Sequence, residues 1–242
     1  QRQRVSIAGA LVLEPDFLVA DEPVSMLDVS IRTEILELLL DLRRERGLTY
    51  LFITHDLSLA WVLADRIGVM YLGKIVEQGP TREVIQNPRH PYTKALISVV
   101  PVPDPDVRHD RIILHGERPD PTDIPSGCRF HPRCPVAFER CGWTSDEVLG
   151  TLRELAADAR SKDVRGITLA GPRTLTWSHA PADAETWLRD LIAEHSERHR
   201  SLKSIESLEA RSDGLRIQLH AYQEPALRSV APDVLVSCLL YE

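Results

Sequence analysis

Three titratable side chains follow two short apolar runs of the sequence. Phe17 to Ala20 leads directly into Asp21 and Glu22, and the run from Tyr50 to Ile53 is followed closely by His55. Each run is short and rich in apolar, β-branched or aromatic residues, which predicts two buried parallel strands. Ligands of open α/β sheets bind at the carboxyl ends of the strands. We therefore expect two carboxylates and an imidazole at one sheet edge, a set that suits a metal-bound nucleotide.

The elements around these runs predict how the side chains are positioned. Asp28 or Ser30 can cap a helix that runs to Arg46, with Gly47 as its stop. Further along, Ile67 to Tyr71 and Lys74 to Gln78 read as the two strands of a hairpin. A short helix follows from Thr81 to Gln86, and Thr81 can cap it. The alternation of strands and helices predicts a doubly wound parallel sheet.

Four segments resemble motifs of the ATP-binding subunits of ABC transporters, in the family's order and at similar separations. They resemble the end of the signature helix, the Walker B strand, the D-loop and the switch-histidine loop, and they are Gln1 to Leu11, Leu18 to Pro23, Ser25 to Asp28, and Ile53 to Asp56. Met26 stands in the D-loop segment where the family usually has alanine. The resemblance implies part of a P-loop NTPase fold, an α/β parallel sheet with flanking helices.

The same resemblance implies roles for individual residues in ATP hydrolysis at a head-to-tail dimer interface. Asp21 would hold Mg²⁺ and Glu22 would polarise the attacking water. His55 would contact the γ-phosphate, and Asp28 would connect the two sites across the dimer. In the signature-like segment, nucleotide contacts would come from Gln1 and Gln3.

The resemblance also implies partners and a location. Two such ATP-binding subunits would drive two membrane-spanning permease subunits, with a solute-binding protein delivering the cargo. The subunit would sit at the cytoplasmic face of the cell membrane. The net charge of −7 and the isoelectric point near 5.7 argue against a nucleic-acid partner.

Several family motifs are absent from these 242 residues. The sequence has no Gly-x-x-x-x-Gly-Lys-Ser/Thr loop, whose backbone would cradle the phosphates, and it lacks the Leu-Ser-Gly-Gly stretch and the glutamine loop. We therefore expect the chain to be the carboxyl-terminal part of a longer subunit, and the isolated chain to be inactive. An alternative is a non-catalytic interaction or iron–sulfur redox-sensing module derived from such a subunit.

The second half resembles the extension of oligopeptide and dipeptide importer ATPases. The resemblance rests on Arg89 to Leu96 and on Ile124 to Pro135. It predicts a nucleotide-binding part at 1–88, a helix and Pro-rich linker at 89–125, and a smaller α+β extension at 126–242. Residues 143–202 match nothing in that family and are predicted to be an insertion within the extension, with amphipathic helices at both ends.

The four cysteines could form one metal site. Three lie close together in sequence, Cys128, Cys134 and Cys141, and the fourth is Cys238. Four thiolates suit either Zn²⁺ or an iron–sulfur cluster. By resemblance to some peptide-importer ATPases, the site would hold a four-iron four-sulfur cluster. The alternative is that these cysteines are ordinary buried thiols.

Single motifs also have plain structural explanations. An Asp-Glu pair after an apolar run is commonly the start of a helix, and a lone histidine such as His55 is commonly a loop residue. The order of the four motifs favours the catalytic interpretation. Five histidines with no motif around them receive no chemical role, namely His90, His109, His115, His131 and His179.

Overall fold

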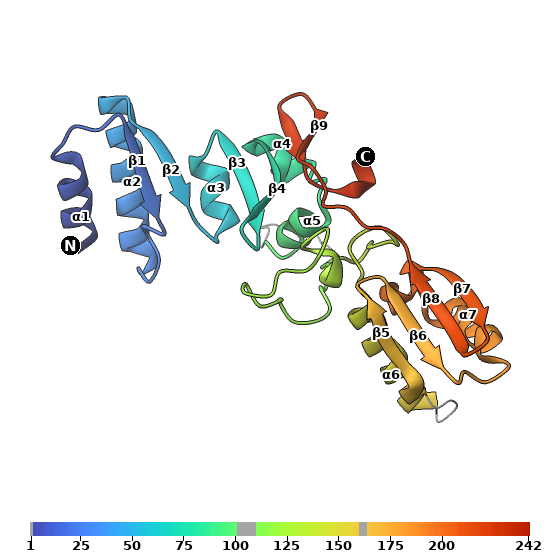
Figure 1. Ribbon diagram of the computed structural model, residues 1–242. Coiled ribbons are helices and arrows are strands. Elements are labelled where there is room, and N and C mark those ends of the chain that lie inside the picture. The colour runs from blue at the N-terminus through green and yellow to red at the C-terminus, as the bar shows by residue number, and fades with distance from the viewer. Residues whose placement is uncertain (1, 101–109, 160–163) are drawn as a thin grey trace.

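The computed structural model describes residues 2–100, 110–159 and 164–242, and it has a mixed α/β fold with three separate sheets (Figure 1). Gln1 and the prolines of the predicted linker at 101, 103 and 105 lie outside the described residues. In the parts described, no helix combines the length and apolarity that a membrane span requires.

The first region holds the predicted catalytic residues on a two-stranded parallel sheet. Its elements are α1 (Arg2–Leu11), β1 (Phe17–Asp21), α2 (Val29–Arg46) and β2 (Thr49–Ile53). The strands pair in register from their first residues to their last, so Asp21 lies opposite Ile53. The helix α2 begins at its Asp28 cap and ends at Gly47, whose φ of 66° is in the left-handed region that glycine adopts freely.

The prediction that β1 and β2 are buried strands is wrong for one face of their sheet. Tyr50 and Phe52 pack toward α2, in a cluster whose buried members include Ile35 and Leu39. On the other face large apolar side chains are about half exposed, and these are Phe17 (54%), Val19 (53%), Leu51 (49%) and Ile53 (45%). No described element covers this face. The predicted doubly wound parallel sheet is also wrong, because only β1 and β2 are parallel in the described residues.

The second sheet is antiparallel and joins distant parts of the chain. Its order is β3-β4-β10-β9, built from β3 (Arg66–Tyr71), β4 (Lys74–Pro80), β9 (Arg228–Ala231) and β10 (Val234–Val236). The predicted hairpin is confirmed, and its turn residues have positive φ angles of 45° at Leu72 and 76° at Gly73. The late strand β10 therefore extends a sheet that begins with β3 and β4 in the first half of the chain.

Three short helices accompany this sheet, namely α3 (Leu57–Leu63), α4 (Thr81–Gln86) and α5 (Pro91–Ser98). Pro80, not Thr81, stands at the N-cap of α4. The Thr81 hydroxyl is buried without a hydrogen-bond partner, so the predicted cap is wrong. The helix instead begins directly from the end of β4, which leaves Thr81 already inside its first turn.

The third sheet and two helices form a separate layered unit, residues 145–219, which we call the αββαββ unit. Figure 1 shows α6 and α7 behind its sheet, whose strand order is β5-β6-β8-β7. Its elements are α6 (Ser145–Ala159), β5 (Ile167–Gly171), β6 (Thr174–Ser178), α7 (Ala184–His195), β7 (Ile205–Arg211) and β8 (Gly214–Leu219), with 3-10 turns η2 (Val164–Gly166) and η3 (Arg200–Ser204). This sheet continues past residue 202, where the predicted insertion ends.

The αββαββ unit has the largest buried apolar cluster among the described residues. Leu152, Leu188, Leu175 and Ile217 are fully buried within it, which confirms that both predicted amphipathic helices pack on a core. The two ends of the unit meet at the turn between β5 and β6. There the Ser145 N–H donates to the Pro172 carbonyl at 3.1 Å, and the Leu219 N–H donates to the Arg173 carbonyl at 2.9 Å.

Candidate functional site

The end of β1 positions Glu22 against the end of β2. The Glu22 N–H donates to the Ile53 carbonyl at 2.9 Å, which extends the parallel pairing by one step. The chain then turns sharply: Glu22 has a φ of 44°, and its carbonyl accepts from both the N–H and the hydroxyl of Ser25. A left-handed backbone is uncommon for glutamate, and such conformations cluster at functional sites.

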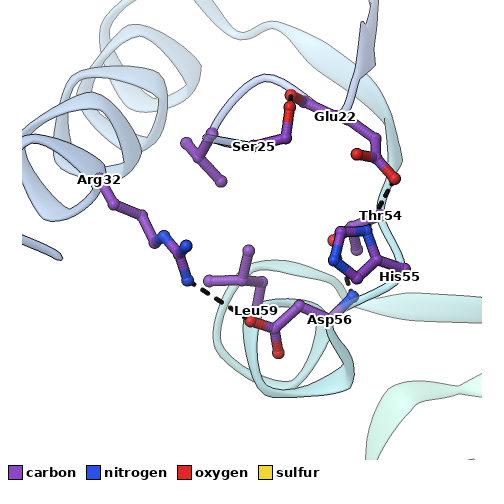
Figure 2. Close-up of a pocket in the computed structure, with 8 residues that line it drawn as sticks. Glu22, Ser25, Arg32, Thr54, His55, Asp56 and Leu59 are labelled. Atoms are coloured by element: carbon purple, nitrogen blue, oxygen red, sulfur yellow. Dashed lines mark hydrogen bonds and ion pairs between the residues drawn. The ribbon is translucent and has the colours of Figure 1, made fainter. Parts of the chain in front are cut away.

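Glu22 and His55 form a direct pair across the two strand ends. His55 Nδ1 lies 2.8 Å from Glu22 Oε1, and Figure 2 shows the ring turned toward the carboxylate. The hydrogen bond to Glu22 and the charge of that carboxylate raise the pKa of His55 above its usual value. Their side chains are exposed by 79% and 42%, so the pair is open to solvent and to a ligand.

Three further residues hold the His55 loop in place, and sequence reasoning had assigned them no role of their own. The Asp56 N–H donates to the Thr54 hydroxyl at 3.0 Å, and Asp56 Oδ1 caps α3 by accepting from the Ser58 N–H at 2.9 Å. Arg32 on α2 forms an ion pair with Asp56 at 3.7 Å (Figure 2). Thr54 and Asp56 could be found as capping residues before a helix, but nothing in the sequence marks Arg32.

A shallow pocket lies between these elements. It is lined by Glu22, Val24, Ser25, Arg32, Thr54, His55, Asp56 and Leu59. Of the predicted site residues, the structure brings Glu22 and His55 together here. Asp21 is exposed at the end of β1 and does not line the pocket. Asp28 also lies outside the lining and caps α2, where its Oδ1 accepts from the Ile31 N–H at 3.0 Å.

The side chains at this site suit the metal ion of a metal-bound nucleotide, but they provide no cradle for its phosphates. Asp21 and Glu22 place adjacent carboxylates at a strand end, and carboxylate oxygens are the ligands that Mg²⁺ prefers. The cradle for the α- and β-phosphates has no counterpart in the 242 residues. Gln3 lies half-buried in α1, outside the pocket lining, and Gln1 is outside the described residues.

The four cysteines converge on a second pocket. Cys128, Cys134, Cys141 and Cys238 all line it, as the prediction that they come together requires. All four are free thiols, and burial raises the pKa of Cys134 and Cys141 to about 12, so these thiols are protonated. In the described residues, however, no three His, Cys, Asp or Glu side chains are arranged to hold a metal ion. The expectation of an iron–sulfur site therefore gains no support from this geometry.

Two histidines without a predicted role lie against the cysteine pocket. His90 is 1% exposed and caps α5, with its Nδ1 accepting from the Tyr92 N–H at 3.1 Å. Burial lowers its pKa to about 4, so the ring is neutral. Beside it, the fully buried Glu77 accepts from the backbone N–H groups of Arg89 and His90, both at 2.9 Å.

His131 connects the cysteine pocket to the αββαββ unit. Its Nδ1 lies 2.9 Å from the Cys128 carbonyl and its Nε2 lies 3.1 Å from Glu147 of α6. Burial acts to raise the pKa of Glu147, but bonds from His131 and Thr144 outweigh it and lower that pKa. Each ring nitrogen of His131 therefore faces an oxygen acceptor, a carbonyl on one side and a carboxylate on the other.

Comparisons with known proteins find relatives for part of the chain. Residues 76–141 match the family model described as the oligopeptide/dipeptide transporter C-terminal region. A putative peptide import ATP-binding protein of Brucella ovis is 54% identical over 144 residues, which cover 60% of this chain and 45% of that protein. The dipeptide transport ATP-binding protein DppF is 54% identical in Haemophilus influenzae and 52% in Escherichia coli, each over 141 residues and 58% of this chain.

These matches are partial on both sides. The chain spans less than half the length of these curated relatives, with 45%, 43% and 42% covered. Among solved structures, cbiO1 of Clostridium perfringens, part of the ABC transporter complex cbiONQ, is 39% identical and covers 35% of this chain with a TM-score of 0.33. The ATP-binding cassette MJ1267 in its ADP conformation is 29% identical and covers 36%, with a TM-score of 0.32.

Proposed function

We propose a function for a chain that is homologous, over about 60% of its length, to the ATP-binding proteins of oligopeptide and dipeptide ABC transporters. In our proposal it contributes the Walker B and switch-histidine half of an ATPase site that energises peptide import. It works at the cytoplasmic face of the cell membrane with a second ATP-binding subunit and two permease subunits. A solute-binding protein delivers the peptide to this assembly.

The observation that carries the proposal is the contact between Glu22 and His55 across the ends of two parallel strands. A carboxylate acts as a general base when it lies within hydrogen-bond reach of the water that it activates. Glu22 orients and deprotonates that water, and His55, held by Glu22 at 2.8 Å, presents its other ring nitrogen toward a terminal phosphate. Asp21 would hold Mg²⁺, which would neutralise charge on the phosphates.

Four further residues contribute from outside the pocket. Asp28 fixes the start of α2 and, through the D-loop segment, communicates with the second site of the dimer. Gln1 and Gln3 contact nucleotide from the signature-like segment. Met26 lies at the tip of the D-loop turn with a φ of 60° and is fully exposed, so it is free to contact the partner subunit.

The exposed apolar face of the parallel sheet supports the proposal that another polypeptide segment packs at this site. Four large apolar side chains are about half exposed there, which is unusual for a strand pair of a finished sheet. We propose that another polypeptide segment covers this face and supplies the phosphate cradle. The isolated chain is then inactive as an ATPase.

The test is phosphate release from ATP by the 242-residue chain, alone and fused behind the amino-terminal half of Escherichia coli DppF. The chain alone should show no turnover, and the fusion should hydrolyse ATP. Glu22→Gln should abolish turnover of the fusion, whereas Glu45→Gln, an exposed change at the far end of α2, should not. Turnover by the chain alone that Glu22→Gln removes would contradict the proposal, as would a fusion insensitive to Glu22→Gln.

The second candidate function is a non-catalytic iron–sulfur redox-sensing module. The four cysteines line one pocket but would have to rearrange to hold a cluster, because the described residues form no metal site in this geometry. A four-iron four-sulfur cluster would bind through Cys128, Cys134, Cys141 and Cys238 after their thiols lose protons. Anaerobic purification followed by iron and sulfide analysis tests it. Near-stoichiometric iron and sulfide that fall together in Cys134→Ser would support the module, and a metal-free protein would contradict it.

A further inference from the structure

The αββαββ unit repeats one element order twice. A helix, a 3-10 turn and a hairpin with a two-residue turn occur as α6-η2-β5-β6 and again as α7-η3-β7-β8. The two helices share the pattern Leu-Arg-acid-Leu, as Leu152 to Leu155 and Leu188 to Leu191. Three buried positions correspond at the same spacing, with Val148, Leu152 and Leu155 matching Ala184, Leu188 and Leu191.

The strand register places an approximate two-fold axis between the two halves. β6 and β8 pair antiparallel, with Leu175 opposite Ile217 and Trp177 opposite Leu215. Leu175 and Leu215 each follow their own hairpin turn by the same number of residues, so rotation exchanges these two pairs. Thr176 lies directly opposite Arg216, at the position of the axis. The same rotation relates the two outer strands, β5 and β7.

The two outer edges differ although their positions correspond. Through their partners on β6 and β8, Thr168 of β5 matches Glu209 of β7, and Leu169 matches Ala210. β7 carries Glu206, Glu209 and Arg211, all exposed, whereas β5 contains no charged residue. Each strand also has one irregular position in its pairing, so a bulge does not distinguish them. Charge on an edge strand is a common protection against pairing with another chain, and β5 lacks it.

Leu169 marks the same edge. It is 51% exposed, and no other large apolar side chain in the described part of the αββαββ unit is exposed by more than about a third. Thr168 and Ala170 beside it are exposed as well. An uncharged strand whose outer edge has no partner strand, and which leaves one apolar side chain in solvent, is a template for strand addition.

We propose that β5 pairs with β5 of a second copy of this chain, which joins two αββαββ units into one continuous sheet. Antiparallel self-pairing is isologous and closes as a dimer, and it brings Leu169 of each copy against the partner strand. Pairing β5 with β7 of another copy would place Glu206 and Glu209 beside an uncharged strand and would grow without closing. Closure as a symmetric dimer therefore favours the β5–β5 contact over the other pairing of these two edges.

The contact is small, so the dimer is weak and responds to salt. Arg165 and Arg173 flank β5 at its two ends, and antiparallel pairing centred on Leu169 brings Arg165 of one copy toward Arg173 of the other. Salt screens this repulsion, so added salt should strengthen the dimer. This contact does not involve the Glu22 pocket and stands independently of the proposed ATPase function.

The experiment is sedimentation velocity of the full chain over a concentration series, with hydrogen exchange at the same concentrations. We expect a reversible dimer, with exchange in residues 167–171 slowing as concentration rises and exchange in β7 unchanged. Thr168→Glu and Leu169→Ala install on β5 the residues that β7 carries at the equivalent positions. Each should raise the dissociation constant by about tenfold or more, since loss of about 1.4 kcal/mol corresponds to that factor.

Two matched controls separate this edge from the other exposed surfaces. Glu209→Gln on β7 and Val19→Lys on the bare face of the parallel sheet should leave β5 protection unchanged. A monomer at all concentrations would overturn the proposal, as would a dimer that loses affinity with Val19→Lys and keeps it with Thr168→Glu. Protection of β5 that needs an added extended peptide, with no effect of chain concentration, would assign the edge to a different partner and also overturn it. Far-ultraviolet circular dichroism of each variant confirms that the fold is retained.

Discussion

The parallel-sheet region and the αββαββ unit differ in which predicted functional residues they hold and in how completely their apolar side chains are buried. The first holds Glu22, His55 and Asp21, yet one side of its sheet leaves large apolar side chains in solvent. The second encloses a continuous core between two helices and four strands, and no predicted catalytic or metal-binding residue lies in it. The predicted catalytic residues and the most completely buried core therefore lie in different regions of this chain. The stability of one region says little about the chemical activity of the other.

The difference in packing between the two regions can be tested most directly by removing one leucine side chain from each. Leu152→Ala in α6 should lower the free energy of unfolding of the αββαββ unit by about 2–5 kcal/mol, because Leu152 is completely buried and its loss leaves a cavity. Leu51→Ala in β2, where the side chain is 49% exposed, should cost less than about 1 kcal/mol. Urea unfolding followed by hydrogen exchange measures each region separately. Equal losses at the two sites would mean that the bare face is covered in solution.

The link between the two halves can be tested through Glu147. Glu147→Gln should destabilise the chain by about 2–3 kcal/mol, since it leaves the fully buried His131 beside a neutral partner. Glu34→Gln removes the exposed ion pair with Arg4, whose side chains are 56% and 57% exposed, and should cost less than about 1 kcal/mol. Thermal unfolding of both variants, with a double-mutant cycle on His131, is the measurement. Equal losses of stability in the two variants would show that the contact between the cysteine loop and α6 contributes little to the free energy of unfolding.

His90 predicts acid sensitivity in the region between the two. Its folded pKa of about 4 lies below the unfolded value near 6.5, so the unfolded chain binds the proton more readily. Stability is therefore complete above about pH 6.5 and falls as the pH drops toward 4, by roughly 2 kcal/mol at pH 5. His90→Asn keeps a side chain that can cap α5 and should remove this part of the pH dependence. Chemical unfolding of both proteins from pH 7 to 5 tests it, and parallel curves would refute the assignment.

The smallest effect concerns the open pair of the parallel-sheet region. Glu22→Gln should lower the pKa of His55 toward its ordinary value, because the carboxylate that favours the imidazolium is gone. Unfolding stability should hardly change, since both side chains are substantially exposed. Titration of the His55 ring signals by NMR gives the pKa in each protein. A pKa that stays raised in the variant would show that Glu22 is not its partner in solution.

Local patterns in the sequence predicted much of what the structure contains. The Asp28 cap, the Gly47 stop, the β3–β4 hairpin and the approach of Glu22 to His55 depend on residues near one another or on the parallel pairing of two short strands. The bare face of β1 and β2 could not be predicted. Hydrophobic strands look alike in sequence whether or not another element covers them.

Most of the features that the sequence did not predict are contacts between residues far apart in the chain. Nothing near Gln78 indicates that Leu235 will pair beside it, and nothing near His131 indicates Glu147 as its partner. The repeat of α6-η2-β5-β6 as α7-η3-β7-β8 is not evident in the sequence, because its core positions correspond in spacing while most of the residues differ. Its 3-10 turns and two-residue hairpin turns are visible only in the backbone.

The pairing of β4 with β10 has a consequence for how the chain is made. At a synthesis rate of about 5–20 residues per second, Leu235 follows its partner Gln78 by roughly 8–30 s, and β4 lacks this partner strand throughout that interval. The αββαββ unit, whose strands are mostly joined by tight turns, can fold during the delay. Because its two ends meet at Pro172 and Arg173, its folding shortens the loop that separates β10 from β4. Folding of the αββαββ unit during synthesis would thus bring the last strand closer to the first half of the protein.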